Sequence, residues 1–355
     1  DEVLRVPPSI PSVLGGKNNS SFSQSQFAAQ KIVSHYNIPS HQSLVNALDN
    51  YQEAKVKWNK FSLVDRLDIF LDVADKIEFE YYDKMMAYTI LGQNKTPYEA
   101  EIDSICELVD FLRFNVSYIY ELHQKQPISN IKETFQGQEY TILNRSQYLP
   151  LNGFVASITP FNFTAISLNL ACAPALMGCT VVWKPAPTAV LSSYYGMLAL
   201  EEAGLPPGVI NFITGDAELI GSKVLSHPSL SGVHFTGSTK TFQKVWKSVA
   251  NNIEHYKTYP RVVGETGGNN YHFVFPEYEN ISWLVEACIR GAFEYSGQKC
   301  SATNRIYIPK SLYRSFMSLM TDKLDTLRID NPEKDSIFTS AVIHKQSYDT
   351  LTNVI

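Results

Sequence analysis

The stretch FVASITPFNFTAISLNLACAPALMGCTVVWKP, residues 154–185, decides the fold. Two short apolar runs, 154–158 and 180–183, have the length of buried strands, and the segment between them, 165–177, has the length of a helix. The alternation continues with helices at 189–203, 216–226 and 239–253 and with strands at 209–213, 233–235 and 261–264. Strands that alternate with helices of this length predict βαβ units, a parallel sheet and right-handed crossovers.

Ligands bind such sheets at the carboxyl ends of the strands, which here means after residues 158, 183, 213, 235 and 264. The last of these segments is VVGETGG, residues 262–268, where Glu265 stands at the change from strand to loop. Further along, YSGQKCSA at 295–302 places Cys300 after a segment with helical spacing. A carboxylate and a thiol on two such loops can form a base–nucleophile pair. The alternatives are a small buried cysteine and a surface or helix-capping glutamate.

Size and composition limit the class of protein. The 355 residues suffice for two domains, and 44% hydrophobic with 18% charged residues is ordinary for a globular chain. A net charge of −5 gives no basic surface for nucleic acid, and no apolar run approaches the ~20 residues that span a bilayer. The five cysteines form no CxxC pair, so we expect no disulfide framework, no metal site and a reducing compartment. Cys172, Cys179 and Cys288 are expected in the core.

The remaining segments are less regular. Residues 1–40 read as an irregular wrap with one or two strands, and from Ser43 the pattern predicts helices that end with 78–91 and 97–122. The last helix carries its apolar face on Ile102, Ile105, Cys106, Val109 and Leu112. Residues 128–150 alternate polar and apolar and predict a hairpin, while a helix from 281, a strand at 305–308 and a helix at 310–327 begin a second domain.

Several motifs in one order resemble a known family. The glutamate and cysteine segments, with TPFNFTAI at 159–166 and AEIDSICELVDFLRFN at 100–115, resemble the aldehyde dehydrogenase superfamily. The form GQKCSA at 297–302 is most similar to its glutamate-semialdehyde (1-pyrroline-5-carboxylate) branch, and the likeness runs from about residue 30 to the end. Members of this family continue further, so we expect the sequence to be an N-terminal part of such a protein.

The resemblance implies an α/β fold of the aldehyde dehydrogenase type, with a Rossmann-type parallel sheet, helices on both faces and an oligomerisation β-arm. It implies an NAD-binding domain at 1–127 and 151–263, the arm at 128–150 and the first part of an α/β catalytic domain at 264–355. The arm would cross to a partner subunit in a homo-oligomer. From the pattern alone, a local two-strand flap is an equal alternative.

By the same resemblance Cys300 is the nucleophile. At an ordinary pKa near ~8.5 a thiol is only partly ionised and needs help; Lys299 and nearby amides would lower the pKa, and the end of the preceding helix would raise it. Glu265 is the general base for thioester hydrolysis. Asn162 and the Cys300 backbone N–H would hold the oxyanion. The alternative for Asn162 is to cap the helix that starts near residue 164.

The expected cofactor is NAD. The residues expected to bind it are Thr159, Pro160, Phe161, Lys184, Pro185, Gly215, Phe235, Thr236, Gly237, Ser238 and Glu265. Lys184 would reach ribose hydroxyls, and the helix that opens at Gly237–Ser238 would offer backbone N–H groups to a pyrophosphate. The usual GxGxxG fingerprint is absent. Pro187 stands where the family often has a ribose-binding glutamate, and Phe242 where a second glycine is common, which leaves NADP open.

The implied reaction is oxidation of L-glutamate γ-semialdehyde to L-glutamate in proline breakdown, in the mitochondrial matrix. The residues that correspond to substrate contacts are Glu101, Phe163, Lys299 and Ser301. Phe163 would pack the aliphatic carbons, and Lys299 and Ser301 would meet a carboxylate. The alternatives are a dehydrogenase for another aldehyde and an inactive nucleotide-binding or assembly module.

Overall fold

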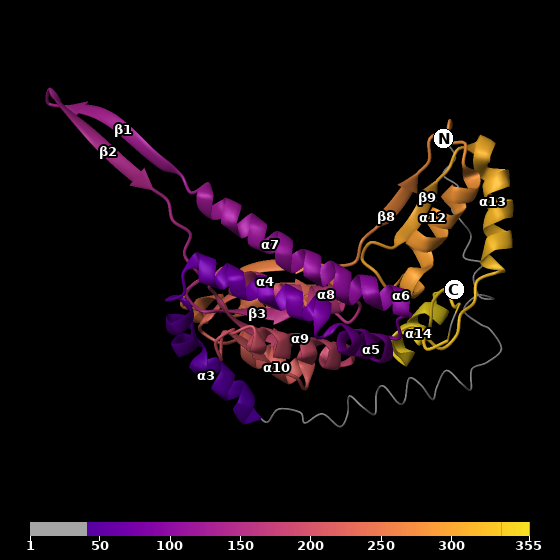
Figure 1. Cartoon of the computed structure of the whole chain (residues 1–355), viewed down its shortest axis with the longest axis horizontal. Helices are drawn as coiled ribbons and strands as arrows, with labels where there is room; N and C mark the ends of the chain where they lie inside the picture. The colour runs from indigo at the N-terminus through magenta and orange to yellow at the C-terminus, as the bar shows by residue number, and fades with distance from the viewer. Residues whose placement is uncertain (1–40, 335, 355) are drawn as a thin grey trace.

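A computed structural model of the chain describes residues 41–334 and 336–354 (Figure 1). The irregular segment expected at 1–40 lies outside the described residues. The described chain forms a central sheet with helices on both faces, a projecting hairpin and a smaller α/β block near its C-terminal end (Figure 1).

The central sheet has five parallel strands in the order β5-β4-β3-β6-β7, which confirms the predicted α/β class. The strands are β3 (Phe154–Ile158), β4 (Thr180–Lys184), β5 (Ile210–Phe212), β6 (Leu230–Thr236) and β7 (Arg261–Glu265). They alternate with α8 (Thr164–Leu176), the short turn η2 (Pro187–Ala189) and α9 (Val190–Glu202), α10 (Ala217–Leu225), α11 (Thr239–Asn251) and the short turn η3 (Ile253–His255). The strand order reverses at β3, so the carboxyl ends of β3 and β6 flank the crevice where ligands bind in such sheets.

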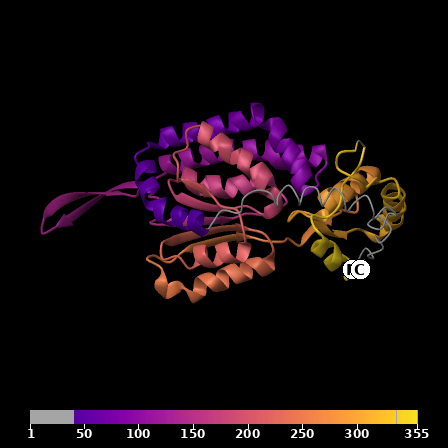
Figure 2. The same cartoon turned by 90° about the horizontal axis from the view of Figure 1, so that it is seen from below.

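Both faces of the sheet are covered. Val181 and Trp183 of β4 pack into one hydrophobic cluster with α8 and α9, whereas Val182 packs into another with α10 and α11. Successive side chains of a strand point to opposite faces, so a strand covered on both sides must be apolar throughout. Figure 2 shows helices on either side of the sheet, and this confirms the doubly covered arrangement.

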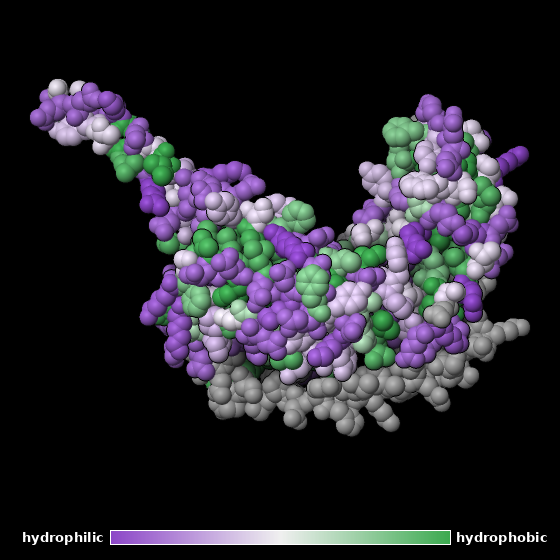
Figure 3. Space-filling view, in the orientation of Figure 1, coloured by the Kyte–Doolittle hydropathy of each residue, from purple (hydrophilic) through white to green (hydrophobic). Residues whose placement is uncertain are grey.

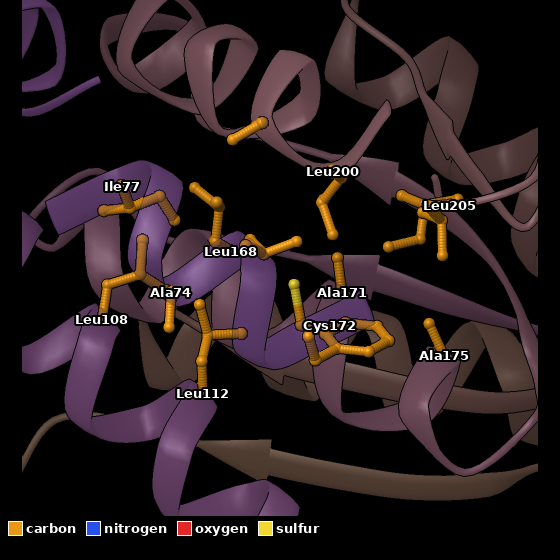
Figure 4. Close-up of a cluster of buried hydrophobic side chains, with 14 of the residues drawn as sticks. Ala74, Ile77, Leu108, Leu112, Leu168, Ala171, Cys172, Ala175, Leu200 and Leu205 are labelled. Carbon is orange, nitrogen blue, oxygen red and sulfur yellow. The ribbon is translucent and has the colours of Figure 1, made fainter. Parts of the chain in front are cut away.

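The N-terminal helices form a further layer over α8 and α9. They are α3 (His41–Trp58), α4 (Leu63–Phe79), α5 (Tyr82–Gln93), α6 (Pro97–Ala100), the π-helical segment η1 (Glu101–Cys106) and α7 (Glu107–Gln124). Figure 4 shows Leu108 and Leu112 of α7 with Ala74 and Ile77 of α4 facing α8. Cys172 of α8 lies inside this cluster, and Cys172, Cys179 and Cys288 are all buried, as predicted. None of the described helices is both long and apolar enough to cross a bilayer.

The predicted helix at 97–122 exists, but its apolar face was partly wrong. Ile105, Val109 and Leu112 are buried, whereas Cys106 is exposed and Asp103 is 1% exposed. The cause is η1, because a π-turn takes more residues than an α-turn and so rotates the following side chains about the axis. The rotation turns an acid inward where the 3.6-residue period would have placed it outward.

The predicted hairpin consists of β1 (Ile128–Phe135) and β2 (Gln138–Arg145). Gln136 and Gly137 connect the strands with φ of 50° and 79°, a two-residue turn whose twist matches that of the strands. Every residue of both strands is exposed, and the hairpin points away from the body (Figure 1). Figure 3 shows hydrophobic side chains on the half nearer the body. The hairpin therefore projects rather than lying on its own body, and contact with a partner subunit stays a prediction.

The second block contains β8 (Asn270–Phe273) and β9 (Thr303–Tyr307), which pair in parallel, with α12 (Ile281–Phe293), the short turn η4 (Glu294–Gly297), α13 (Lys310–Leu324) and α14 (Lys345–Thr352). Its core includes Cys288 of α12 and Phe316 of α13. The sequence analysis did not identify β8, because its four residues carry no alternation long enough to stand out. The domain boundaries given above stay predictions.

Candidate active site

Glu265 and Cys300 meet where the two blocks of the chain join. Glu265 is the last residue of β7, and Cys300 follows η4 after α12. The Cys300 Sγ donates a hydrogen bond to Glu265 Oε1 at 3.3 Å, and Thr236 Oγ1 of the neighbouring strand β6 donates to Glu265 Oε2 at 3.4 Å. Cys300 is half-buried and Glu265 is exposed. The fold thus brings together the two groups that the sequence predicts as a pair.

The environment of Cys300 raises the pKa of its thiol, first through burial and then through the hydrogen bond and charge of Glu265. Backbone N–H groups of Cys300 and Ser301 act in the opposite direction but do not reverse the shift. Lys299 does not lower the pKa of the Cys300 thiol as suggested above, because its ammonium donates to Asp103 and Glu294 instead. The resting pair is therefore a neutral thiol that donates to a carboxylate able to take its proton.

Asn162 lies beside the cysteine loop. Its Nδ2 donates to the backbone oxygen of Gln298 at 3.0 Å, which leaves the second amide hydrogen for another acceptor. Its Oδ1 is buried without a hydrogen-bond partner among the described residues. Helix α8 has Phe163 as its N-cap residue, so the capping alternative for Asn162 is wrong. The side chain is thus held at the site rather than used to begin the helix.

The loop before Cys300 has an uncommon backbone. Tyr295, Ser296 and Gly297 have φ of 51°, 53° and 70°, three consecutive residues in the left-handed region, where residues with a Cβ are strained. Glu99 Oε1 accepts the Tyr295 N–H at 2.7 Å, and Thr339 Oγ1 accepts the Ser296 N–H at 3.0 Å. Segments far apart in the chain therefore hold the conformation that presents the thiol.

The residues expected to bind substrate divide into two groups. Lys299 and Phe163 lie together, with Lys299 Nζ 5.3 Å from the Phe163 ring centroid, while Ser301 is exposed next to the thiol. Glu101 is exposed, and its Oε1 accepts a hydrogen bond from Tyr82 at 2.5 Å. The structure shows no hydrogen bond or ion pair from Glu101 to Cys300, Asn162 or Glu265 within the described residues.

Glu107 is the acid on this helix that the sequence analysis missed. Its pKa is raised to about 7 by burial and by the charges of Asp103 and Glu265, and Lys299 and Lys95 oppose the shift. Its Oε2 is buried without a hydrogen-bond partner among the described residues. A buried carboxyl whose pKa is shifted and which feels the charge of Glu265 is a candidate functional group. Helical periodicity could not have identified Glu107, because the π-turn η1 sets the direction in which its side chain points.

The residues expected to bind the cofactor lie at or just after the carboxyl ends of the five strands, with Gly215 after β5 and Glu265 at the end of β7. Lys184 is 8% exposed, its Nζ donates to Pro185 O at 3.0 Å, and burial lowers its pKa against the charge of Asp216. An ammonium has three hydrogens, so this one keeps donors for a ligand. The side chains of Thr159 and Phe235 are buried, at 5% and 2% exposure, which leaves mainly their backbones to face a ligand.

The segment after β6 begins α11. Ser238 is its N-cap and accepts the Thr241 N–H at 3.2 Å. A Cβ on Gly237 would lie 2.8 Å from the Phe235 ring, so this position requires glycine for close packing. The Phe242 ring stacks on Phe235 at a centroid distance of 5.4 Å and covers Gly264, which accounts structurally for the phenylalanine noted above.

Comparisons of the sequence with family models and with known proteins identify relatives of this chain. A sequence model described as the aldehyde dehydrogenase family matches residues 16–355. The chain is 41% identical over 355 residues to the mitochondrial delta-1-pyrroline-5-carboxylate dehydrogenase of Emericella nidulans, covering 99% of this chain and 60% of that protein. It is 44% identical over 308 residues to the mitochondrial protein of the same name from Homo sapiens, covering 86% and 53%.

A solved structure is similar as well. The crystal structure of the delta-pyrroline-5-carboxylate dehydrogenase from Mycobacterium tuberculosis bound with NAD superposes with a TM-score of 0.82 at 34% identity, covering 100% of this chain and 69% of that one. The chain thus spans 60% and 53% of the length of the two curated relatives named above.

Proposed function

This chain belongs to the aldehyde dehydrogenase family, and we propose from that premise that its protein oxidises L-glutamate γ-semialdehyde to L-glutamate with NAD. The relatives named delta-1-pyrroline-5-carboxylate dehydrogenase support this substrate, which is the open form of that cyclic imine. The observation that carries the proposal is the contact between Cys300 Sγ and Glu265 Oε1 at 3.3 Å, with Asn162 beside it.

The chemistry begins with the thiol. Glu265 takes the proton of Cys300, and the sulfur attacks the aldehyde carbon to form a C–S bond. The carbonyl oxygen gains the electron pair of the broken π-bond. The free hydrogen of Asn162 Nδ2 and the Cys300 backbone N–H donate to that oxygen, and one such donor is typically worth about 3–4 kcal/mol of barrier.

NAD, when bound, accepts the hydride that leaves the former aldehyde carbon. The product on the sulfur is a thioester, which water must hydrolyse. Glu265, once it has returned its proton to solvent, takes a proton from that water as general base, and the sulfur leaves as the thiolate. The exposure of Glu265 supports this role, because solvent water can reach its carboxyl group.

The residues present fit a dinucleotide. Lys184 keeps donors for ribose hydroxyls, and the α11 N-terminus after Gly237–Ser238 offers backbone N–H groups to a pyrophosphate. The solved relative with NAD bound supports NAD as the cofactor. Pro187 lies in η2, and its side chain offers no carboxylate to a ribose. The preference for NAD over NADP is therefore part of the proposal.

The substrate groups are also proposed. Lys299 and Ser301 would meet the carboxylate end, and Phe163 would line the aliphatic part. Glu101 remains a proposed contact, but Glu107 suits the role better because its carboxyl shares the environment of Lys299 and Glu265. The relatives' names support a mitochondrial matrix location, and the projecting hairpin supports a homo-oligomer.

The test is turnover in the protein at its natural length. Cys300→Ser should abolish NADH formation from the semialdehyde, whereas Cys106→Ser, which removes an exposed thiol of η1, should leave it unchanged. Undiminished turnover in Cys300→Ser contradicts the proposal. A panel of short semialdehydes separates the rival dehydrogenases by their kcat/KM. Binding of NAD without turnover on any of these aldehydes would favour the inactive module.

A further inference from the structure

A fully buried lysine lies behind the cysteine loop. Lys95, between α5 and α6, is 0% exposed. Its Nζ pairs with Asp103 Oδ2 on η1 and lies 3.6 Å from the ring centroid of Tyr295, which is a cation–π contact. A buried ion pair is often replaceable by apolar side chains without loss of stability, so stability alone is a weak reason for this pair.

Asp103 links Lys95 to the residue beside the nucleophile. Its Oδ1 accepts from Lys299 Nζ at 3.1 Å, and Lys299 also donates to Glu294 Oε1 at 2.6 Å. Because Lys299 is bonded directly to Cys300 in the chain, the series Lys95–Asp103–Lys299 runs from the N-terminal helices to the thiol. The π-turn makes this possible, since it turns Asp103 inward.

The same lysine also reaches the start of the strained loop. The Tyr295 ring lies against Lys95 Nζ, its hydroxyl donates to Gln93 O at 2.6 Å, and its N–H is held by Glu99. Left-handed Tyr295 and Ser296 persist only if the surroundings over-determine them. Lys95 thus contacts the loop at residue 295 directly and at residue 299 through Asp103.

We propose that Lys95 is a positioning residue for Cys300: by bridging Asp103 and the Tyr295 ring, it fixes the loop 295–299 and keeps the thiol on Glu265. The inference rests on the proposed function only for the role of Cys300 as nucleophile. Without Lys95 the loop relaxes, Cys300 moves away from Glu265, and the two influences that raise the pKa of the thiol, burial and the Glu265 contact, weaken.

The test uses chemical reactivity, which needs no turnover. The variants are Lys95→Met and Asp103→Asn, which nearly keep the side-chain volume, in the protein at its natural length. The rate of alkylation of Cys300 by iodoacetamide is measured as a function of pH by peptide mass spectrometry. Exposed Cys106 serves as the reference thiol in the same sample. We expect the alkylation midpoint of Cys300 to move down and the rate at pH 7.5 to rise about threefold to tenfold, while Cys106 changes by less than about twofold.

Two controls separate positioning from folding. Lys84→Met removes an exposed lysine of α5 that lies over the Tyr81 and Tyr195 rings, and it should leave Cys300 unchanged. The double variant Lys95→Met/Asp103→Asn should react no faster than the faster single variant, because both changes break one series of contacts. A lower Tm with unchanged alkylation of Cys300, or additive effects in the double variant, overturns the proposal. Loss of turnover in Cys300→Ser tests the proposed function separately, so the two can fail independently.

Discussion

Replacing Glu265 with Gln should make Cys300 more reactive and the enzyme slower. The carboxylate oxygen lies 3.3 Å from the sulfur and helps to raise the pKa of the thiol. A unit charge at this distance is worth about 1 kcal/mol in water and about 5 kcal/mol at an effective dielectric constant of 20. Because Cys300 is only half-buried and Glu265 is exposed, we take about 1–2 kcal/mol, which lowers the thiol pKa by about one unit.

The assay compares two readouts of the same variant. Alkylation at Cys300 against pH should show a midpoint about one unit lower in Glu265→Gln, while turnover falls about 10²–10⁴-fold because thioester hydrolysis loses its base. Glu121→Gln is the matched control, since that exposed carboxylate of α7 pairs only with exposed Lys125 among the described ion pairs and should change neither readout. An unchanged or higher midpoint would refute the electrostatic reasoning, and retained turnover would refute the role of Glu265 as base.

Three further predictions follow from the described contacts. In the folded state the pKa of Glu107 is raised to about 7, so the native state binds its proton more tightly than the unfolded state does. The free energy of unfolding should therefore fall by about 1–2 kcal/mol as pH rises from about 4.5 to 7. Denaturant unfolding at pH 5 and 8 should show this loss in the parent and in Glu101→Gln but not in Glu107→Gln. Gly264→Ala would put a Cβ 2.1 Å from the Phe242 ring and should cost about 1–3 kcal/mol; thermal unfolding should show a much smaller cost in a Phe242→Ala background, and equal costs would contradict the clash. Asn162→Ala should lower kcat about 10²–10³-fold with little change in Tm, because Asn162 is not the cap of α8; a fall in Tm with kcat unchanged would mean a purely structural side chain.

The sequence predicted the architecture well because that information is local. Each strand of the sheet is a short, mainly apolar run, and each helix between them is a segment of similar length bounded by Gly, Pro or polar residues, so the succession of β3 to β7 along the chain followed without tertiary information. Their order in the sheet was seen only in the structure. The motifs around Glu265 and Cys300 were enough to identify the family, which the comparisons confirm. The short strand β8 was not predicted, because four residues do not establish a period of alternation.

The sequence by itself therefore determined the α/β class and the family, and it predicted Glu265 and Cys300 as a pair. It also placed Glu265 at the ligand-binding edge, since the carboxyl ends of parallel strands meet at one edge whatever the side chains do. Cys300 follows η4 rather than a strand of this sheet, so its contact with Glu265 was decided by the tertiary structure. Only the tertiary structure decided that the pKa of Cys300 is raised and that Lys299 pairs with Asp103 rather than with the thiol. It also decided that Asp103 of η1 points inward. These depend on burial and on contacts between residues as far apart as Glu99 and Tyr295. The desolvation and charge felt at one atom come from all its neighbours in space, and no local pattern encodes them.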